Sequence, residues 1–147
     1  MEYTCFVELA HPIDDVVQAW SDPENLKYWH EQFMKYEILH GDFIQPGAQT
    51  HLFYAIVEKP TCITQTVINN VLPAEIVYEY QTDEFVSRIT ETFIEKETDT
   101  TLWTQKTEYI QFNDSYFESM AKMFSKRFEM KSQVLMDRFK TMLDKVS

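Results

Sequence analysis

Glycine is scarce in this sequence. Its 147 residues include two glycines, Gly41 and Gly47, and neither glycine nor proline follows Pro73. Phosphate-binding loops such as GxGxxG and the Walker motif need several glycines, because only a residue without a side chain lets a phosphate approach the backbone closely. The composition therefore excludes nucleotide binding through these common loops.

Basic residues are also few, with 13 Lys and Arg against 24 Asp and Glu and a formal net charge of −11. Affinity for nucleic acids comes mainly from Lys and Arg that displace counterions, and anionic membranes attract proteins in the same way. Every apolar run is far shorter than the ~20 residues that span a bilayer. We expect no nucleic-acid partner and no stable insertion into a membrane.

Cysteines and histidines lack the spacing of a metal site. Cys5 and Cys62 are far apart and form no CxxC, and the four histidines form neither HxH nor HExxH. We expect two ordinary thiols in a reducing compartment, no metal and no cofactor. The first residues, MEYTCFVELA, lack the basic and apolar segments of a signal peptide, which favours a cytoplasmic location.

Among the features that are present, the pattern at the start predicts a strand and two short helices. Residues 2–10 alternate apolar and polar side chains with a period of two, as in a half-buried strand. Pro12 suits the first position of a helix, and Asp22 followed by Pro23 suits the cap and first position of a second one that ends near Trp29.

Strand patterns then follow one another as far as Phe112. The six segments, separated by gaps of turn length, are 34–40, 48–58, 61–71, 75–81, 85–96 and 100–112. Successive strands with short connections indicate an antiparallel meander.

After Phe112 the apolar period lengthens to three and four residues. Ser115 and Glu118 match a capping box, and no breaker occurs between them and Val146. We therefore predict one helix of about 30 residues, roughly 45 Å long, which must lie across the sheet to bury its apolar face.

This order of elements, with three local phrases, resembles the START-related or SRPBCC (helix-grip, polyketide cyclase-like) superfamily. The phrases are HPIDDVVQAWSDPENLKYW at 11–29, VLPAEIVYEYQ at 71–81 and MDRFKTMLDKV at 136–146. The resemblance spans residues 1–147 as a single domain and implies an α+β helix-grip fold. In that fold the curved sheet grips the C-terminal helix, and a cavity between them opens near the two short helices.

Aromatic residues on one face of the later strands suggest an inner wall for such a cavity. Tyr78 and Tyr80 lie opposite the charged face of their strand, and Trp103 and Tyr109 lie opposite Lys106 in theirs. Tyr and Trp carry a polar atom that needs a partner when buried, which favours a cavity wall over a dry core. Packing in an ordinary core is the alternative for each.

Further candidate wall or mouth residues come from the remaining elements. Three lie at or just after the end of the second short helix, three lie in strands, and three lie in the long helix: Trp29, His30 and Phe33; His51, Tyr54 and Arg88; Met120, Met123 and Phe124. By the resemblance, the first three lie where the cavity opens. Arg88 could bind a ligand carboxylate, and an outward, solvated arginine is the alternative. The strands of His51 and Gln65 are mixed on both faces, so the pattern does not orient them.

Three functions remain open at this point. The first is binding of a small, largely hydrophobic molecule, of a lipid, polyketide or aromatic kind. The second is a cyclase- or dehydratase-type enzyme that uses the same cavity, with His51, Tyr54, Tyr78 or Arg88 as acid-base candidates and no catalytic residue assigned. The third is a protein-interaction module like the chaperone activators of the superfamily, with a protein partner.

Overall fold

The structure, a computed structural model, describes residues 1–56 and 59–146. Its elements in chain order are β1 (Glu2–Leu9), α1 (Ile13–Ser21), the 3-10 helix η1 (Pro23–Asn25), α2 (Leu26–Trp29), β2 (Phe33–His40), β3 (Gln49–Ile56), β4 (Lys59–Val71), β5 (Glu75–Gln81), β6 (Phe85–Glu97), β7 (Thr100–Phe112), α3 (Ser115–Met123) and α4 (Ser125–Val146). This order confirms the predicted strand, short helices and six-strand meander, followed by a long helix at the C-terminal end. Residues 57 and 58, at the end of the predicted strand 48–58, lie outside the described residues.

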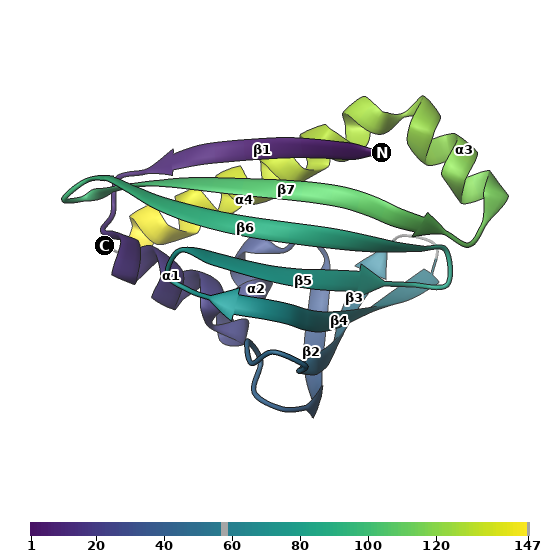
Figure 1. Cartoon of the computed structure of the whole chain (residues 1–147), viewed down its shortest axis with the longest axis horizontal. Helices are drawn as coiled ribbons and strands as arrows, with labels where there is room; N and C mark the ends of the chain where they lie inside the picture. Colours follow the sequence, from purple (N-terminus) through teal and green to yellow (C-terminus); the bar gives the residue numbers. More distant parts are fainter. Residues whose placement is uncertain (57–58, 147) are drawn as a thin grey trace.

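The seven strands of the described residues form one antiparallel sheet in the order β1-β7-β6-β5-β4-β3-β2. The first strand pairs with the last, so that Cys5 lies opposite Gln105 and Leu9 opposite Thr101. Figure 1 shows α4 crossing behind β1 and β7, with α1 at one end of the sheet and α3 at the other. The sheet and α4 are thus the two layers of a helix-grip fold.

The two short helices begin as local chemistry predicts, with a shift of one position in the first. Pro12 has extended backbone (φ −61°, ψ 149°) and precedes α1 as its cap instead of occupying its first turn. The Asp22 carboxylate accepts a hydrogen bond from the Glu24 amide at 3.0 Å, which confirms it as the N-cap of the next helix.

The prediction of one continuous C-terminal helix is wrong. Helix α3 ends at Met123 and α4 begins at Ser125, because Phe124 leaves the helical region (φ −110°, ψ 32°). Phe117 and Phe128 lie on either side of the break with ring centroids 6.0 Å apart. A straight helix would separate residues eleven positions apart by about 16 Å. The bend therefore lets both rings join one aromatic cluster at the end of the sheet.

The cap of α3 also differs from the prediction by one residue. Asp114, not Ser115, is the N-cap, and its carboxylate accepts a hydrogen bond from the Phe117 amide at 2.9 Å. Asp and Ser are both strong N-caps, so the sequence offered two neighbouring candidates.

The core lies where α1, α2 and the second half of α4 cover the sheet. Trp103 is fully buried, with Phe139 of α4 at 5.1 Å and Trp29 of α2 at 5.9 Å between ring centroids. Trp20 of α1 is buried against Tyr78 and Phe93. These contacts fill one end of the space between sheet and helices.

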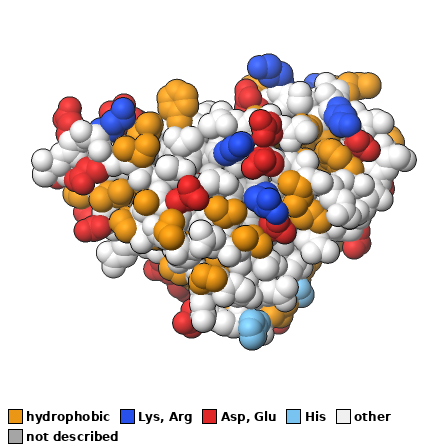
Figure 2. All heavy atoms as spheres, viewed as in Figure 1, with side chains coloured by type: hydrophobic (Ala, Val, Ile, Leu, Met, Phe, Trp, Pro, Cys, Tyr) orange, Lys and Arg blue, Asp and Glu red, His pale blue; other side chains and the backbone are white. Residues whose placement is uncertain are grey.

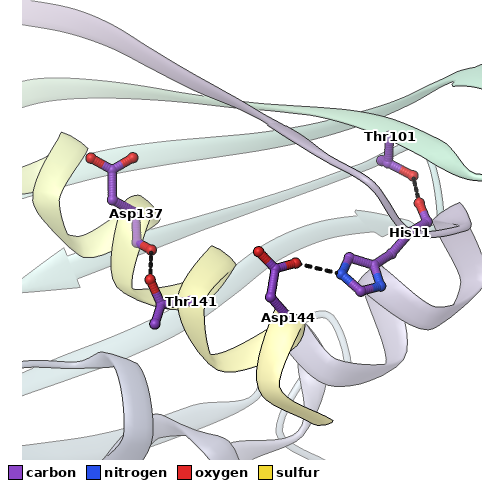
Figure 3. A network of polar contacts seen from close by, with 5 residues as sticks. All are labelled: His11, Thr101, Asp137, Thr141 and Asp144. Carbon is purple, nitrogen blue, oxygen red and sulfur yellow. Dashed lines mark hydrogen bonds and ion pairs between the residues drawn. The ribbon is translucent and has the colours of Figure 1, made fainter. Parts of the chain in front are cut away.

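Polar contacts hold the C-terminal end of α4 against the segment before α1 (Figure 3). The His11 ring contacts Asp144 through Nε2 and Oδ1 at 2.7 Å, and Thr101 donates a hydrogen bond to the His11 carbonyl at 2.8 Å. The segment before α1 is therefore attached both to α4 and to β7 through His11.

The face of the sheet away from α4 carries charges of both signs next to one another among apolar side chains (Figure 2). Arg88 pairs with Glu79 at 2.6 Å, and Lys106 lies 3.8 Å from both Glu2 and Glu108. Among the described residues, no helix is long and apolar enough to cross a membrane.

Candidate ligand-binding site

A cavity of about 790 Å³ lies between the inner face of the sheet, α3 and the first half of α4. Its wall comes from nearly every strand and from both C-terminal helices: Tyr3, Trp29, His30, Ile56, Thr61, Ile63, Tyr78, Tyr80, Thr82, Glu84, Phe85, Ser87, Ile89, Gln105, Thr107, Tyr109, Phe117, Met120, Phe128, Lys131, Ser132 and Leu135. The core described above closes one end. Most of the wall is apolar or aromatic, with neutral polar groups between.

The cavity opens at a different place from the one that the sequence predicts. Trp29 and His30 retain only 3% and 7% of their exposure, whereas Ile56, Glu84 and Lys131 are exposed. The prediction that the cavity opens at Trp29 and His30 is therefore wrong, because α4 covers α2. These exposed wall residues lie on α4, at the end of β3 and between β5 and β6.

Tyr78 and Tyr80 point inward, as the alternation along β5 predicts, with ring centroids 5.3 Å apart. Tyr109 enters the wall further along, stacked on Phe85 at 5.1 Å. Burial raises the pKa of all three tyrosine hydroxyls. All three therefore stay protonated and neutral at ordinary pH.

His30 supplies a neutral ring at the closed end. Its Nδ1 lies 2.8 Å from the Tyr54 hydroxyl. Burial, with a smaller contribution from the nearby Arg138 charge, lowers the pKa of His30 to about 3. Tyr54 is buried beside His30 without reaching the wall itself, so it holds the ring in place.

A carboxyl group that the sequence interpretation missed lies behind this wall. Glu91 has no exposure, and it accepts hydrogen bonds from Tyr78 Oη (2.6 Å), Trp103 Nε1 (2.8 Å) and Gln105 Nε2 (2.9 Å). Burial raises the pKa of Glu91 to about 7, although these three hydrogen bonds act in the opposite direction. Strand parity could have found it, because Glu91 alternates in step with the inward Ser87 and Ile89.

Two predicted residues of the inner face lie beside the wall instead of in it. Trp103 points inward as predicted, but Phe139 and Trp29 cover it, so it belongs to the core. Phe33 is half-buried against Tyr54, with ring centroids 5.7 Å apart, and does not reach the cavity. Which inward residues remain uncovered depends on where the helices cross the sheet.

His51 and Arg88 lie on the opposite face of the sheet, which corrects their predicted place in the cavity. Along β3 the buried residues are Thr50, Leu52 and Tyr54, so His51 faces outward, with its ring 5.9 Å from Phe53. Arg88 pairs with Glu79 on the same outer face. Strand alternation excludes both side chains from the cavity.

The three candidates from the predicted long helix differ in their exposure. Met120 lies in the wall, whereas Met123 is 75% exposed and Phe124 is 38% exposed, and neither of these lines the cavity. Met120 and Met123 both lie in α3, on different faces of that helix, and Phe124 lies at the break itself.

Nothing in this site suggests a metal. Among residues 1–56 and 59–146, no group of three or more His, Cys, Asp or Glu side chains lies close enough together to hold an ion. Cys5 is buried and Cys62 is exposed, and both are free thiols.

Sequence comparisons give no relatives, since no protein-family model and no curated protein matches the chain. Comparison with solved structures, in contrast, finds proteins of similar fold. A START superfamily protein from Mycobacterium smegmatis matches with a TM-score of 0.77 at 17% identity, over 99% of each chain. The Zhui aromatase/cyclase from Streptomyces sp. R1128 matches with a TM-score of 0.79 at 12% identity, over 98% of this chain and 93% of that one.

A third similar structure is norcoclaurine synthase from Thalictrum flavum, in complex with dopamine and hydroxybenzaldehyde. It matches with a TM-score of 0.73 at 15% identity, over 100% of this chain and 88% of that one. At such low identities these matches establish the fold and leave the activity open.

Proposed function

We propose that this chain, which has the helix-grip fold of START-related (SRPBCC-type) proteins, binds a small, largely hydrophobic molecule in the cavity between sheet and helices. The observation that carries the proposal is the cavity itself, whose volume is about 790 Å³ and whose wall is mainly apolar and aromatic. Ligand pockets commonly measure roughly 300–1,000 Å³ and combine such walls with a few polar groups.

Two of the similar structures add support by analogy. One is described as an aromatase/cyclase, and the other holds dopamine and hydroxybenzaldehyde. Both descriptions concern proteins that handle small ring compounds. The ring-lined wall formed by Tyr78, Tyr80, Tyr109 and Phe117 suits a ligand of that kind.

Binding is favoured over a cyclase or dehydratase reaction, because three of the four acid-base candidates lie outside the cavity wall: His51 and Arg88 lie on the outer face, and Tyr54 does not reach the wall. It is favoured over a chaperone-activator role, because a protein-interaction module needs no cavity of this size. The proposed function is therefore binding without turnover.

The test is binding of the uncharged fluorescent probe N-phenyl-1-naphthylamine. Its fluorescence should rise with the unmodified protein and should stay low with Ser87→Trp. Ser87 is a small, buried wall residue between Tyr80 and Tyr109 on neighbouring strands, so an indole at this position fills the middle of the cavity. Thr90→Trp is the matched control, because Thr90 lies on the outer face of the same strand.

Loss of probe binding in Ser87→Trp but not in Thr90→Trp supports the cavity as the site. Equal probe binding by all three proteins, or no binding by any of them, contradicts the proposed function. Circular dichroism and urea unfolding of the three proteins verify that both variants fold.

A further inference from the structure

A groove runs along α4 beside the two short helices. One hollow of about 280 Å³ borders the first half of α4, and another of about 500 Å³ borders its C-terminal half, which lies next to α1 (Figure 1). Arg138 lines both hollows, so they form one groove, called here the α4 groove. Helix α4 makes one wall, and the other wall includes Ala19 of α1, Tyr28 of α2 and Glu31.

Four basic side chains form a row in the α4 groove. They are Arg127, Lys131, Arg138 and Lys145. Steps of four, seven and seven residues separate them, and such steps return to nearly the same side of a helix after one, two and two turns. At 1.5 Å per residue the row is roughly 27 Å long. The groove therefore carries positive charge along its whole length.

These four cations form no salt bridge within the described residues. Several other cations do, such as Lys122, which lies 2.6 Å from Glu118 on α3. Arg127 and Lys131 also lie one helical turn apart, where like charges repel. Arg138 donates a hydrogen bond through Nε to the Trp29 carbonyl at 3.1 Å, which holds its guanidinium in the middle of the groove. The row thus lacks counter-charges of its own.

The charge of α4 contrasts with that of the chain. Helix α4 has six Lys and Arg against three Asp and Glu, whereas the whole chain has a net charge of −11. The three acidic residues of α4, Glu129, Asp137 and Asp144, line neither hollow. Among the described residues that line the α4 groove, Glu31 is the acidic one, and it is exposed. An anionic occupant is therefore favoured inside the groove.

Apolar side chains lie between the cations. Met130 and Val134 are 64% and 50% exposed in one hollow, and Tyr28 is 58% exposed in the other. Their burial by an occupant would add a hydrophobic contribution to the attraction between charges. The occupant should therefore carry apolar groups as well as negative charges.

The shape of the groove and the charge around it select the kind of occupant. A flat membrane surface does not enter a groove, and the net charge of −11 repels an anionic membrane or a nucleic acid outside it. A peptide segment is narrow enough to lie in the groove. At about 3.3 Å per residue, eight extended residues span roughly 27 Å and reach all four cations.

We infer that the α4 groove binds an acidic segment of a partner protein, about eight extended residues long, in which apolar side chains alternate with Asp and Glu. Carboxylates of the segment pair with the row of cations, and its apolar side chains cover Met130, Val134 and Tyr28. This interaction is separate from ligand binding in the cavity.

Fluorescein-labelled octapeptides test the inference by fluorescence anisotropy. The peptide DLEEVDLE carries both features, NLQQVNLQ lacks the charges, and DSEESDSE lacks the apolar side chains. DLEEVDLE should bind at least about tenfold more tightly than either relative, since a difference of about 1.4 kcal/mol in binding free energy gives a factor of ten.

Charge reversal at the two ends of the row tests its position. The double variant Arg127→Glu, Lys145→Glu should bind DLEEVDLE at least about tenfold more weakly, because two attractive pairs become repulsive. Lys96→Glu, Lys140→Glu is the matched control: it changes the net charge equally at exposed residues that do not line the α4 groove. Its affinity for the peptide should stay within about threefold of the unmodified protein.

Circular dichroism and urea unfolding verify that both double variants fold. Arg127→Gln, Lys145→Gln, which removes the charges without reversing them, should give a smaller loss of affinity and replaces the first variant if that one unfolds. All variants should bind N-phenyl-1-naphthylamine like the unmodified protein, so failure of this inference is distinct from failure of the proposed function.

Four outcomes overturn the inference. The first is no rise in anisotropy with DLEEVDLE, and the second is equal binding of DLEEVDLE and either relative. The third is an equal loss of affinity in the groove variant and its control. The fourth is a different occupant: phosphatidylserine vesicles that bind in place of the peptide, or a dimer in sedimentation equilibrium that the groove variant dissociates.

Discussion

Glu91 is a single carboxyl group whose burial affects both stability and the ligand site. Burial raises its pKa from 4.5 to about 7 in the folded chain. The protonated form therefore favours the folded state, and this stabilisation is fully present below pH 4.5 and is lost as the pH rises to about 7. A shift of this size corresponds to roughly 3 kcal/mol at most.

Comparison of Glu91→Gln with the unmodified protein should reveal this dependence. The free energy of unfolding of the unmodified protein, minus that of the variant, should fall by up to roughly 3 kcal/mol between pH 4.5 and 7.5. Urea unfolding at several pH values measures it. His30, whose pKa is lowered to about 3, contributes an opposite slope between pH 6.5 and 3, but it does so in both proteins and cancels. A pH-independent difference would show that Glu91 titrates normally.

At the scale of elements, α3 forms one side of the cavity through one of its faces. Phe117 and Met120 line the cavity, whereas Tyr116 and Met123 are 79% and 75% exposed. The helix is nine residues long, too short to be stable alone, so it depends on the contacts of Phe117 with Phe85 and Phe128.

Met120→Ala and Met123→Ala form a matched pair on this helix. Met120→Ala should weaken binding of N-phenyl-1-naphthylamine by roughly fivefold, because about 1 kcal/mol of apolar contact with the ligand is lost. Met123→Ala should leave probe affinity unchanged. Fluorescence titration measures both, and equal effects of the two substitutions would show that α3 does not contact the ligand.

At the scale of the whole molecule, one end of the space between sheet and helices is filled and the other is hollow. A ligand that binds only the folded chain stabilises it by about 2.7 kcal/mol at a concentration 100 times its Kd. For a chain of this length, such a gain corresponds to a rise in Tm of roughly 5–10 °C.

Thermal unfolding with and without N-phenyl-1-naphthylamine should show this rise. Ser87→Trp should melt at the same temperature with and without the probe, because its cavity is already filled. A shift of equal size in both proteins would place the probe outside the cavity.

Much of the fold and part of the site could be predicted, because local periodicity reports which face of an element is apolar. Alternation along β5 placed Tyr78 and Tyr80 inward, and Asp22 was recognised as an N-cap. The same alternation along β6 places Arg88 outward, which agrees with the alternative left open for it, and places Glu91 inward. The position of Glu91 is therefore a signal that the sequence carries.

Other features had no local signal. No glycine or proline marks the break at Phe124, which follows from the packing of Phe117 against Phe128 across it. Trp103 and Tyr109 share a face of one strand, yet Phe139 covers the first and leaves the second in the cavity wall. Only the path of α4 over the sheet separates them.

The sequence by itself determined the order of elements, the antiparallel meander and the inward faces of β5 and β7. Each of these depends on residues a few positions apart, whose side-chain period decides what can be buried. The helix-grip architecture followed from the resemblance of the sequence to SRPBCC proteins. Tertiary structure alone decided which inward residues form core and which form cavity, and that Glu91 meets Tyr78, Trp103 and Gln105 from two neighbouring strands. These outcomes depend on contacts between distant segments, which no local pattern encodes.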